Sequence, residues 1–530
     1  MDSSFRLSMA WLHTWGGVTL GAVLFAIFWT GTLTVFAEEI DRWMKPETRI
    51  VWDEARAANY SHDAVLAAAL EVIGEEQPRD VWLMPPTPRK PVVRVQYRDA
   101  EGGWQGPLFL NPTTYEPLKV TASEAGTRFI YPFHYSLHIG WQNLGDWIVG
   151  IAAMAMLALL VSGVVIHRKI FAEFFTLRWE RKLPRASLDL HNITGVLALP
   201  FHLVITFSGL VLAYNLYVPS VKEAVYGDDR SAFLAEAYGR FERGATGERA
   251  PLASLDAMVR QASEQWAADG PRGLWVANPY DTGGVVGVYR TRGNAVAPNE
   301  SIRYFDAATG ALLHVTAARP VKQVQDFFVG LHLILFDHWP IRWAYFVMGM
   351  MGCVLIATGY IYWLETRRKR HAAQNLSGVR AVEALTIGSV TGIVIATLAF
   401  FVVNRFLPPG ARLEGAGLER AELEIWAFYL VWLGSFVHAW KRQGSALREQ
   451  ASAIVWLSSI AVLFNWMTTG DHLGRTTLSG PWAVAGMDAM LLGLAAVAAY
   501  VRNRLPSHDD VARAAHGAAS RSGRSGQLEA

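Results

Sequence analysis

Histidines recur on the long apolar segments of this 530-residue chain, where an ionisable side chain is costly and is therefore a candidate for function. Two of them open segments that read nearly alike, Leu12–Val18 (LHTWGGV) and Leu190–Val196 (LHNITGV), with His13 and His191 in the same place. The likeness continues to Thr30-Gly31 and Ser208-Gly209. Two facing imidazoles bind a haem iron from both sides. The repeat therefore predicts paired axial ligands for haem.

A second match lies where the chain enters the next apolar segment of each copy. His138 falls in Tyr135–Gly140 (YSLHIG), and His332 falls in Val329–Ile334 (VGLHLI). Parallel repeats in membrane proteins are related by a pseudo-twofold axis along the membrane normal. Such an axis places His13 opposite His191 near the inner face and His138 opposite His332 near the outer face. Two b-type haems, one in each leaflet, would then conduct electrons across the bilayer.

Three further histidines leave this pairing open. His202 follows His191 by eleven residues, so on a straight helix both face the same way, about 16 Å apart. His134 lies one turn before His138 on the same face, and His167 closes the second apolar segment. Any of the three could replace a symmetric partner. A proton relay is the alternative chemistry, whereas zinc is disfavoured because no HExxH motif or carboxylate cluster accompanies these helices.

Composition places the chain among membrane proteins, since 52% of its residues are hydrophobic and 21 are Trp, which gathers at membrane interfaces. A net charge of only +2 implies no polyanionic partner such as nucleic acid. The single cysteine, Cys353, excludes an intrachain disulfide, a four-cysteine iron–sulfur cluster and a covalently attached CxxCH haem.

Eight apolar segments are long enough to span a bilayer. They are 11–37, 143–166, 190–216, 341–364, 384–406, 423–441, 452–469 and 481–501. Positive residues gather in alternate loops, at Arg168, Lys169, Arg178, Arg181, Lys182 and Arg185, at Arg367, Arg368, Lys369 and Arg370, and at Lys441, Arg442 and Arg448. The positive-inside rule then places both termini in the cytoplasm and the two long inserts outside.

The two inserts, 38–130 and 217–325, are themselves expected to be copies of one α+β unit. Each has a helical pattern followed by strands and ends in a strand–turn–strand. The expected helices are His62–Ile73 and Pro251–Trp266, the strands Pro91–Tyr97 and Gly284–Tyr289, and the closing turns 108–118 and 303–313.

These features resemble the PepSY-associated transmembrane helix proteins of bacteria. The resemblance covers about 1–370 and rests on the duplicated span–insert–span unit, the Leu-His-x-x-x-Gly helix starts, the Ser/Thr-Gly helix ends and the turn Asp306–Gly310 (DAATG). It implies PepSY folds for the inserts, bis-histidine haem b, and one-electron reduction of ferric siderophores in the periplasm. The first insert departs from the pattern, because Asn111 replaces Asp and Tyr115 replaces Gly.

The expected fold is a mainly α membrane protein: an eight-helix transmembrane bundle, consisting of a duplicated four-helix haem-binding core and four extra helices, with two periplasmic α+β PepSY-like domains. In chain order the expected parts are 1–37 (first span), 38–130 (first PepSY-like domain), 131–170 (second span), 186–216 (third span), 217–325 (second PepSY-like domain), 326–370 (fourth span), 384–501 (a C-terminal four-helix membrane module) and 505–530 (a disordered tail). The module could dock a partner, bind quinone or brace the core.

A ferric siderophore is the expected substrate, with a cytoplasmic flavoprotein or a quinol as electron donor. Reduction releases iron because Fe(II) binds hard oxygen donors far less well than Fe(III). Aromatic residues at the outer rim could line the chelate site or form an ordinary interfacial belt. They are Tyr131, Phe133, Tyr135, Trp141, Trp339 and Trp343.

Two functions of other classes compete with the reductase. A permease for the intact chelate would need broken helices and polar residues at the midplane, where few appear beyond His202. A sensor or scaffold would use the outer domains to bind a peptidase or another envelope protein, and its histidines would be dispensable.

Overall fold

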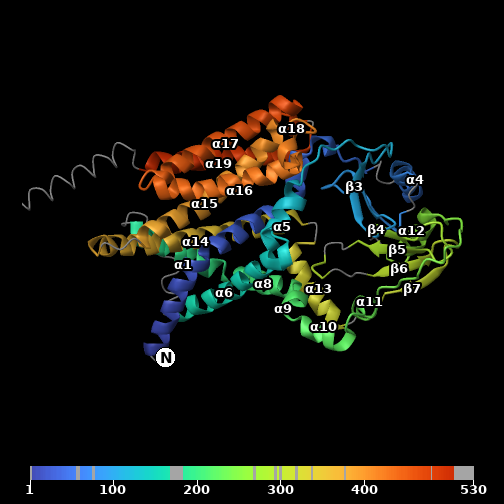
Figure 1. Ribbon diagram of the computed structural model, residues 1–530, viewed down its shortest axis with the longest axis horizontal. Coiled ribbons are helices and arrows are strands. Elements are labelled where there is room, and N and C mark those ends of the chain that lie inside the picture. The colour runs from blue at the N-terminus through green and yellow to red at the C-terminus, as the bar shows by residue number, and fades with distance from the viewer. Residues whose placement is uncertain are drawn as a thin grey trace, which may run out of the picture. The chain divides into compact units, whose positions relative to one another are not determined.

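The computed structural model describes residues 3–54, 60–74, 78–167, 183–266, 270–291, 295–297, 301–316, 320–335, 338–374, 378–478 and 480–505. Residues 168–182, which make up most of the basic loop, and the tail from 506 onward lie outside this range. Within it the protein is mainly helical with a smaller antiparallel sheet, which confirms the expected class (Figure 1). The chain forms two compact units: a helical unit (Met1–Met44, Thr121–Leu203 and Ala344–Ala530) and a sheet unit (Lys45–Val120 and Val204–Trp343).

Seven helices of the described chain are long and apolar enough to cross a membrane. They are α1 (Ser3–Thr34), α6 (Leu144–Ile166), α14 (Trp339–Ala373), α15 (Gly378–Phe406), α16 (Arg420–Lys441), α17 (Ala446–Thr469) and α19 (Trp482–Arg504). An eighth candidate is the pair α7 (Leu183–Leu197) and α8 (Leu199–Leu212). All eight apolar segments identified in the sequence therefore have helical counterparts.

The third segment is a broken helix, because α7 and α8 meet at a bend of 63°. Pro200 explains the break, since a proline inside a helix lacks the N–H that the preceding turn would bind and its ring clashes with that turn. His191 and His202 lie on opposite sides of the bend. The expectation that they share one face of a straight helix is therefore wrong.

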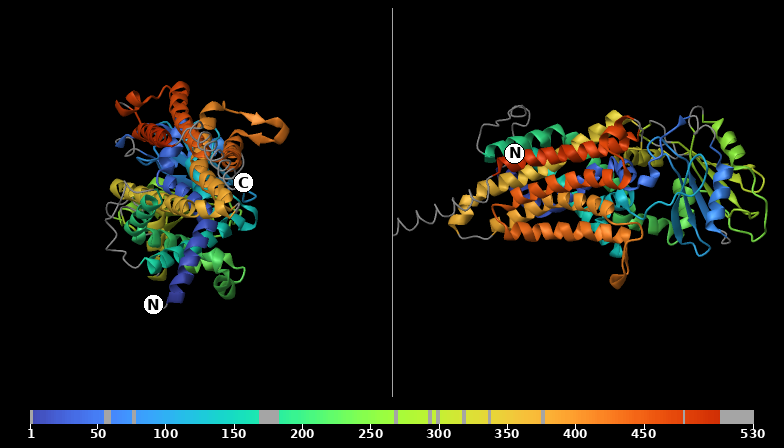
Figure 2. Two further views of the ribbon diagram at one scale, coloured as in Figure 1. Left: turned by 90° about the vertical axis from the view of Figure 1, so that its left-hand side faces the viewer. Right: turned by 90° about the horizontal axis from the view of Figure 1, so that it is seen from above.

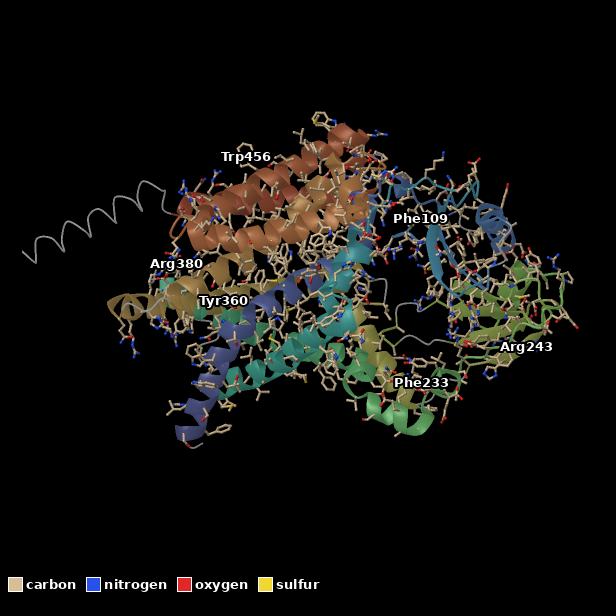
Figure 3. The ribbon with its side chains drawn as sticks, viewed as in Figure 1. Phe109, Phe233, Arg243, Tyr360, Arg380 and Trp456 are labelled. Atoms are coloured by element: carbon tan, nitrogen blue, oxygen red, sulfur yellow. The ribbon has the colours of Figure 1, made fainter. Side chains whose placement is uncertain are left out.

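Neighbouring helices of the helical unit run side by side (Figures 1 and 2). α15 packs on α1, α16 and α17, while α17 packs on α19, and α1 on α6. Tyr360 of α14 donates a hydrogen bond to the carbonyl oxygen of Val18 on α1 (3.0 Å), whereas Trp456 of α17 projects outward from the bundle (Figure 3). Large exposed apolar side chains of this kind are typical of a lipid-facing surface.

Shorter helices connect these elements. They are α2 (Ala37–Met44), η1 (Pro46–Thr48), the π-helix η2 (Ala125–Ile130), α5 (Tyr131–Ser136), η3 (Trp141–Asn143), α9 (Tyr214–Tyr217), α10 (Pro219–Tyr226), α11 (Arg230–Tyr238), α13 (Pro320–Leu333), η4 (Glu414–Ala416) and α18 (Leu473–Leu478), with a small hairpin of β8 (Arg412–Leu413) and β9 (Leu418–Glu419).

The sheet unit contains one antiparallel sheet of seven strands in the order β3-β2-β1-β4-β5-β6-β7. The strands are β1 (Asp80–Met84), β2 (Val93–Arg98), β3 (Trp104–Leu110), β4 (Pro271–Ala277), β5 (Val285–Arg290), β6 (Ile302–Asp306) and β7 (Leu312–Val315). Pairing of β1 with β4, which sets Trp82 opposite Trp275, joins the two inserts. The helices α4 (His62–Ile73) and α12 (Leu255–Ser263) contribute to the same apolar core. The inserts therefore share one sheet and one core.

Local sequence signals account for the ends of these elements. Ser61 caps α4 by accepting a hydrogen bond from the amide of Ala64 (3.2 Å), which is the usual role of serine before a helix. The closing turns of the inserts need a left-handed residue, and Gly310 (φ +74°) supplies it in the second. Tyr115 (φ +57°) supplies it in the first, and its hydroxyl accepts a hydrogen bond from the Ser61 amide (2.9 Å). The departure from glycine at Tyr115 thus ties the turn to α4.

The two insert helices cap each other. Asp63 of α4 accepts hydrogen bonds from the Ser254 hydroxyl and the Leu255 amide, both at 2.6 Å. Asp256 of α12 accepts from the Ser61 hydroxyl (2.6 Å) and from the amide and ring Nδ1 of His62 (2.7 and 3.1 Å). Carboxylates are stabilising at helix N-termini because the amides there lack partners and the helix dipole is positive.

Acid is expected to weaken this contact. Burial lowers the pKa of His62 below 6.5, and hydrogen bonds from Ser61 and His62, which outweigh the effect of burial, hold the pKa of Asp256 below its ordinary value. The unfolded chain therefore binds more protons than the folded one as the pH falls below 6.5, so stability is full above that pH and lost on acidification. Thermal unfolding of the detergent-solubilised protein at about pH 7.5 and 5.5 measures this loss.

His62→Gln should reduce the acid-induced fall in melting temperature. His314→Gln is the control, because His314 stacks on Phe241 (5.6 Å between ring centres) and takes no part in the hydrogen bonds between α4 and α12. An equal fall in wild type and His62→Gln would contradict the assignment.

Candidate functional site

The structure brings His13 of α1 and His191 of α7 together inside the helical unit. Their ring centres are 6.2 Å apart and the ring planes stand at 84° to each other. The two residues that open the repeated segments are therefore neighbours, as the pseudo-twofold argument predicts. Both side chains are partly buried.

Each of these rings uses Nδ1 to bind a backbone carbonyl of the neighbouring helix. His13 Nδ1 lies 3.0 Å from the Leu159 oxygen of α6, and His191 Nδ1 lies 2.8 Å from the Leu355 oxygen of α14. A carbonyl can only accept, so Nδ1 carries the proton in both rings. Nε2 is then the nitrogen of each imidazole that can bind a metal ion, and a hydrogen bond from Nδ1 to a carbonyl is the usual support of a ligating histidine.

Glycine makes room for both rings. A Cβ atom at Gly163 would lie 3.2 Å from Cε1 of His13, and one at Gly359 would lie 3.2 Å from Cε1 of His191. Each glycine comes four residues after the carbonyl that its histidine binds and directly follows a hydroxyl residue. For His13 that residue, Ser162, adds a hydrogen bond at 3.2 Å.

His134 is bound in the same way. Its Nδ1 lies 2.9 Å from the Ile27 oxygen of α1, and a Cβ atom at Gly31 would lie 2.6 Å from its Cε1. Again the glycine comes four residues after the carbonyl and follows a hydroxyl residue, Thr30.

His332 repeats the arrangement within the sheet unit. Its Nδ1 lies 2.8 Å from the Ile205 oxygen of α8 and 3.1 Å from the Ser208 hydroxyl, and a Cβ atom at Gly209 would lie 2.9 Å from its Cε1. Ile205 and Gly209 follow Ile27 and Gly31 at the offset of 178 that relates His13 to His191. The repeat equivalent of His332 is therefore His134.

The expected equivalence of His138 and His332 is one helical turn in error. His138 lies beyond the end of α5, where Leu137 and His138 both adopt left-handed backbone angles (φ +49° and +53°). Its side chain is exposed, with the ring edge against Phe129 (5.3 Å between ring centres). The short match of YSLHIG with VGLHLI could not distinguish two histidines one turn apart.

His202 is a fully buried histidine with a different environment. Its Nε2 lies 3.3 Å from the Met348 oxygen, its ring is edge-on to Phe28 (5.4 Å), and its Nδ1 has no hydrogen-bond partner among the described residues. The position 178 residues earlier holds a leucine, Leu24. His202 thus belongs to one repeat alone.

The other candidates are spread along the surface of their own elements. His167 is the C-terminal cap residue of α6 and is partly exposed. Tyr131 and Tyr135 contact each other (5.3 Å between ring centres). Tyr135, Trp141, Trp339 and Trp343 are exposed, whereas Phe133 is fully buried. Phe133 is therefore wrong as a chelate-lining residue.

The Ser/Thr-Gly dipeptides are a sequence signal for the positions of the histidine rings. All four histidines with the shared contacts dock on one: His13 on Ser162-Gly163, His191 on Thr358-Gly359, His134 on Thr30-Gly31 and His332 on Ser208-Gly209. The dipeptides were visible as repeated helix features. The glycine of each dipeptide leaves room for an imidazole ring. This feature favours His134 over His138, because the His134 ring lies against Gly31.

The chain is thus a multi-pass helical protein built on a duplicated unit of two helices with a sheet-forming insert. The sequence model of the PepSY-associated TM region matches residues 10–366, and the chain belongs to this family. It is also similar to the uncharacterized protein PA4219 of Pseudomonas aeruginosa, with 26% identity over 308 residues, which is 56% of this chain and 76% of the relative.

A substitution at Gly31 tests whether this glycine makes room for the His134 ring. We expect Gly31→Ala to push the His134 ring off the Ile27 carbonyl and destabilise the protein by about 1–3 kcal/mol, since overpacking costs this much. Gly17→Ala on the same helix is the matched control, because a Cβ there meets nothing within 4 Å. It should be neutral or stabilising by up to about 1 kcal/mol. Equal melting temperatures of the two variants in detergent would reject the close contact between Gly31 and the His134 ring.

Proposed function

We propose that this membrane protein takes electrons from a cytoplasmic flavoprotein or a quinol, carries them across the bacterial inner membrane through two bis-histidine b haems, and passes one electron to each ferric siderophore on the periplasmic side. The observation that carries the proposal is the His13–His191 pair. An imidazole nitrogen binds a metal at about 2.0 Å, and the ring centre lies about 1.1 Å behind it, so two trans imidazoles on one iron have centres roughly 6 Å apart. The observed separation is 6.2 Å.

The donor set fits a haem iron. Two neutral imidazoles held by carbonyls through Nδ1 offer two Nε2 atoms, which is the axial ligation of a low-spin b haem. Among the residues that the structure describes, no group of three or more His, Cys, Asp or Glu side chains could hold a bare metal ion. Haem b, when bound, supplies a reversible one-electron carrier.

Two further histidines, one in each unit, are held in the same way as His13 and His191. His134 in the helical unit and His332 in the sheet unit each bind a carbonyl through Nδ1 and lie against a glycine. We propose each of them as an axial ligand. His138, which lacks these contacts, is not proposed.

In this reaction the chain would hold the haems, orient the histidine rings and keep water away from them. The helix carbonyls fix the tautomer and orientation of the ligand rings, and the apolar helices exclude water from them. One-electron reduction of a ferric chelate needs no general acid or base, and Fe(II) then leaves its hard oxygen donors. The periplasmic location of the inserts and cytoplasmic termini are part of the proposal and rest on the positive-inside rule.

An absorption spectrum of the detergent-purified protein tests the proposal. The reduced-minus-oxidised difference should show the α-band of a low-spin b haem, with about two haems per chain. A colourless protein after expression with ample haem would reject the redox function and favour the sensor or permease alternatives.

Variants then assign the ligands. His13→Ala or His191→Ala should remove one haem and leave the other. His134→Ala should remove the other haem, and His332→Ala should also lower the haem content without affecting the His13–His191 haem. His138→Ala is the matched control for His134→Ala and should retain both haems. Loss of a haem in His138→Ala, with both retained in His134→Ala, would overturn the assignment.

The ring geometry at the inner pair has a spectroscopic consequence. Perpendicular axial imidazoles leave two iron d-orbitals nearly degenerate, and the planes of His13 and His191 stand at 84°. We expect the oxidised haem at this pair to give a strongly anisotropic low-spin electron paramagnetic resonance signal that disappears in His191→Ala. A rhombic spectrum of the kind given by parallel rings would contradict the geometry.

A further inference from the structure

The C-terminal module (α15, α16, α17 and α19) lies outside the residues matched by the family, which end at 366. Besides packing on α1 and α2, it makes side-chain contacts with the segment that carries His134. We propose that this module is a brace that positions His134 against α1, with Tyr429 and Glu424 as positioning residues; the role of His134 as a ligand rests on the proposed function above.

The first set of contacts is an aromatic cluster on both sides of His134 in the sequence. Phe129 packs on Phe400 (4.9 Å between ring centres) and Phe428 (5.1 Å), and Phe133 packs on Phe428 (5.1 Å) and Trp432 (5.6 Å). Phe129, Phe133, Phe400 and Phe428 are at most 2% exposed. Burial of this extent fixes the faces of η2 and α5 that meet the module.

The second contact closes α5 at its end. The hydroxyl of Tyr429 on α16 donates a hydrogen bond to the carbonyl oxygen of Leu137 (2.7 Å). Leu137 follows the last residue of α5 and has a left-handed backbone (φ +49°). A hydrogen bond here holds a conformation that a leucine does not favour by itself.

The third set anchors the chain just before η2. Glu424 of α16 is fully buried and accepts hydrogen bonds from the Ser123 hydroxyl (2.6 Å) and the Asn404 amide (2.8 Å). Arg420 pairs with Glu424 (2.9 Å) and donates to the Ala122 carbonyl (2.6 Å). A buried ion pair of this kind is a strong structural constraint, because removing one partner leaves an uncompensated charge.

The module also holds the α1 side of the His134 contact. Trp29 of α1, two residues from Ile27 and Gly31, donates to the Thr397 hydroxyl of α15 (3.0 Å). Trp43, at the end of α2, donates to the Asp488 carboxylate of α19 (2.7 Å), and its carbonyl accepts from Arg405 of α15. The helix that carries the imidazole and the helix that receives it are therefore both fixed to the same module.

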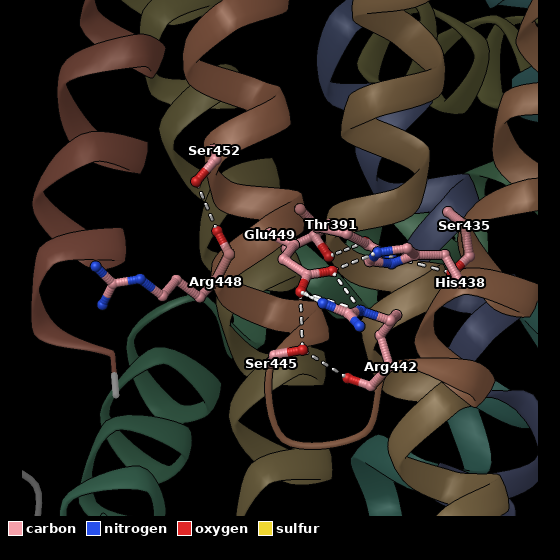
Figure 4. A network of polar contacts seen from close by, with 9 residues as sticks. Thr391, Ser435, His438, Arg442, Ser445, Arg448, Glu449 and Ser452 are labelled. Atoms are coloured by element: carbon pink, nitrogen blue, oxygen red, sulfur yellow. Dashed lines mark hydrogen bonds and ion pairs between the residues drawn. The ribbon is translucent and has the colours of Figure 1, made fainter. Parts of the chain in front are cut away.

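A polar network elsewhere in the module offers a matched control. His438 of α16 donates to Glu449 of α17 (2.8 Å), Arg442 also binds Glu449 (2.6 Å), and Thr391 of α15 donates to Gln450 (2.5 Å) (Figure 4). These bonds join α15, α16 and α17 to one another. His438→Gln should weaken the module internally without releasing Leu137 or Ser123.

The test is hydrogen–deuterium exchange of the full-length protein in detergent together with a redox titration of its haems. Tyr429→Phe should speed amide exchange in 125–138 by roughly 2- to 10-fold, which corresponds to the loss of one net hydrogen bond. It should also shift the midpoint potential of the haem that His134→Ala removes and leave the His13–His191 haem unchanged. His438→Gln should leave both readouts at wild-type values.

Glu424→Gln should act in the same direction and more strongly, because it leaves the buried Arg420 guanidinium without its carboxylate. Tyr429→Phe keeps the proposal testable if that variant does not fold. Unchanged exchange in 125–138 in Tyr429→Phe overturns the brace. Faster exchange with two unshifted potentials overturns the positioning of a ligand. If the wild type binds no haem, the proposed function fails, and the exchange result alone decides whether the module braces this segment.

Discussion

The hydrogen bond from a histidine Nδ1 to a helix carbonyl, made possible by a glycine one turn further along, is the interaction on which the duplicated unit depends. It joins α1 to α6 through His13, α7 to α14 through His191, α1 to α5 through His134 and α8 to α13 through His332. The carbonyls belong to helix backbones, and each histidine ring occupies the space that a side chain would need in place of the glycine. The ring position is therefore set by the main chain of the neighbouring helix.

The duplication extends beyond the helices, and it also explains how the inserts fold. The first insert contributes three strands and the second contributes four, and the pairing of β1 with β4 joins them into one sheet over a shared core. The reciprocal caps of Asp63 and Asp256 then hold α4 and α12 by their N-termini. A contact that each copy makes to the other is lost if either copy unfolds, so the two inserts are expected to unfold as one cooperative body.

Local and periodic features of this fold could be predicted from the sequence, while features that join distant segments could not. The Ala/Leu-rich pattern predicts the bounds of α4, His62–Ile73, and the structure adds Ser61 as its N-cap and Gly74 as its C-cap. The eight apolar segments were found by length and hydropathy, but Pro200 was visible and its bend was overlooked. The β1–β4 pairing links segments about 190 residues apart, and no local pattern encodes it. The sequence left the choice between His134 and His138 open, because it depends on Gly31, a partner on another helix.

The buried charges of the C-terminal module are explained by the same logic. An ionisable residue in an apolar helix is by default a candidate for a transport path or a proton relay. Glu424 and Asp488 are both fully buried, but Glu424 contacts Arg420, Ser123 and Asn404, and Asp488 contacts Trp43 and Asn465. Residues 43 and 123 flank Lys45–Val120, the part of the first insert that belongs to the sheet unit. Charges committed to such contacts are anchors, and an anchor at each end of the insert fixes the helices whose spacing the histidine contacts require.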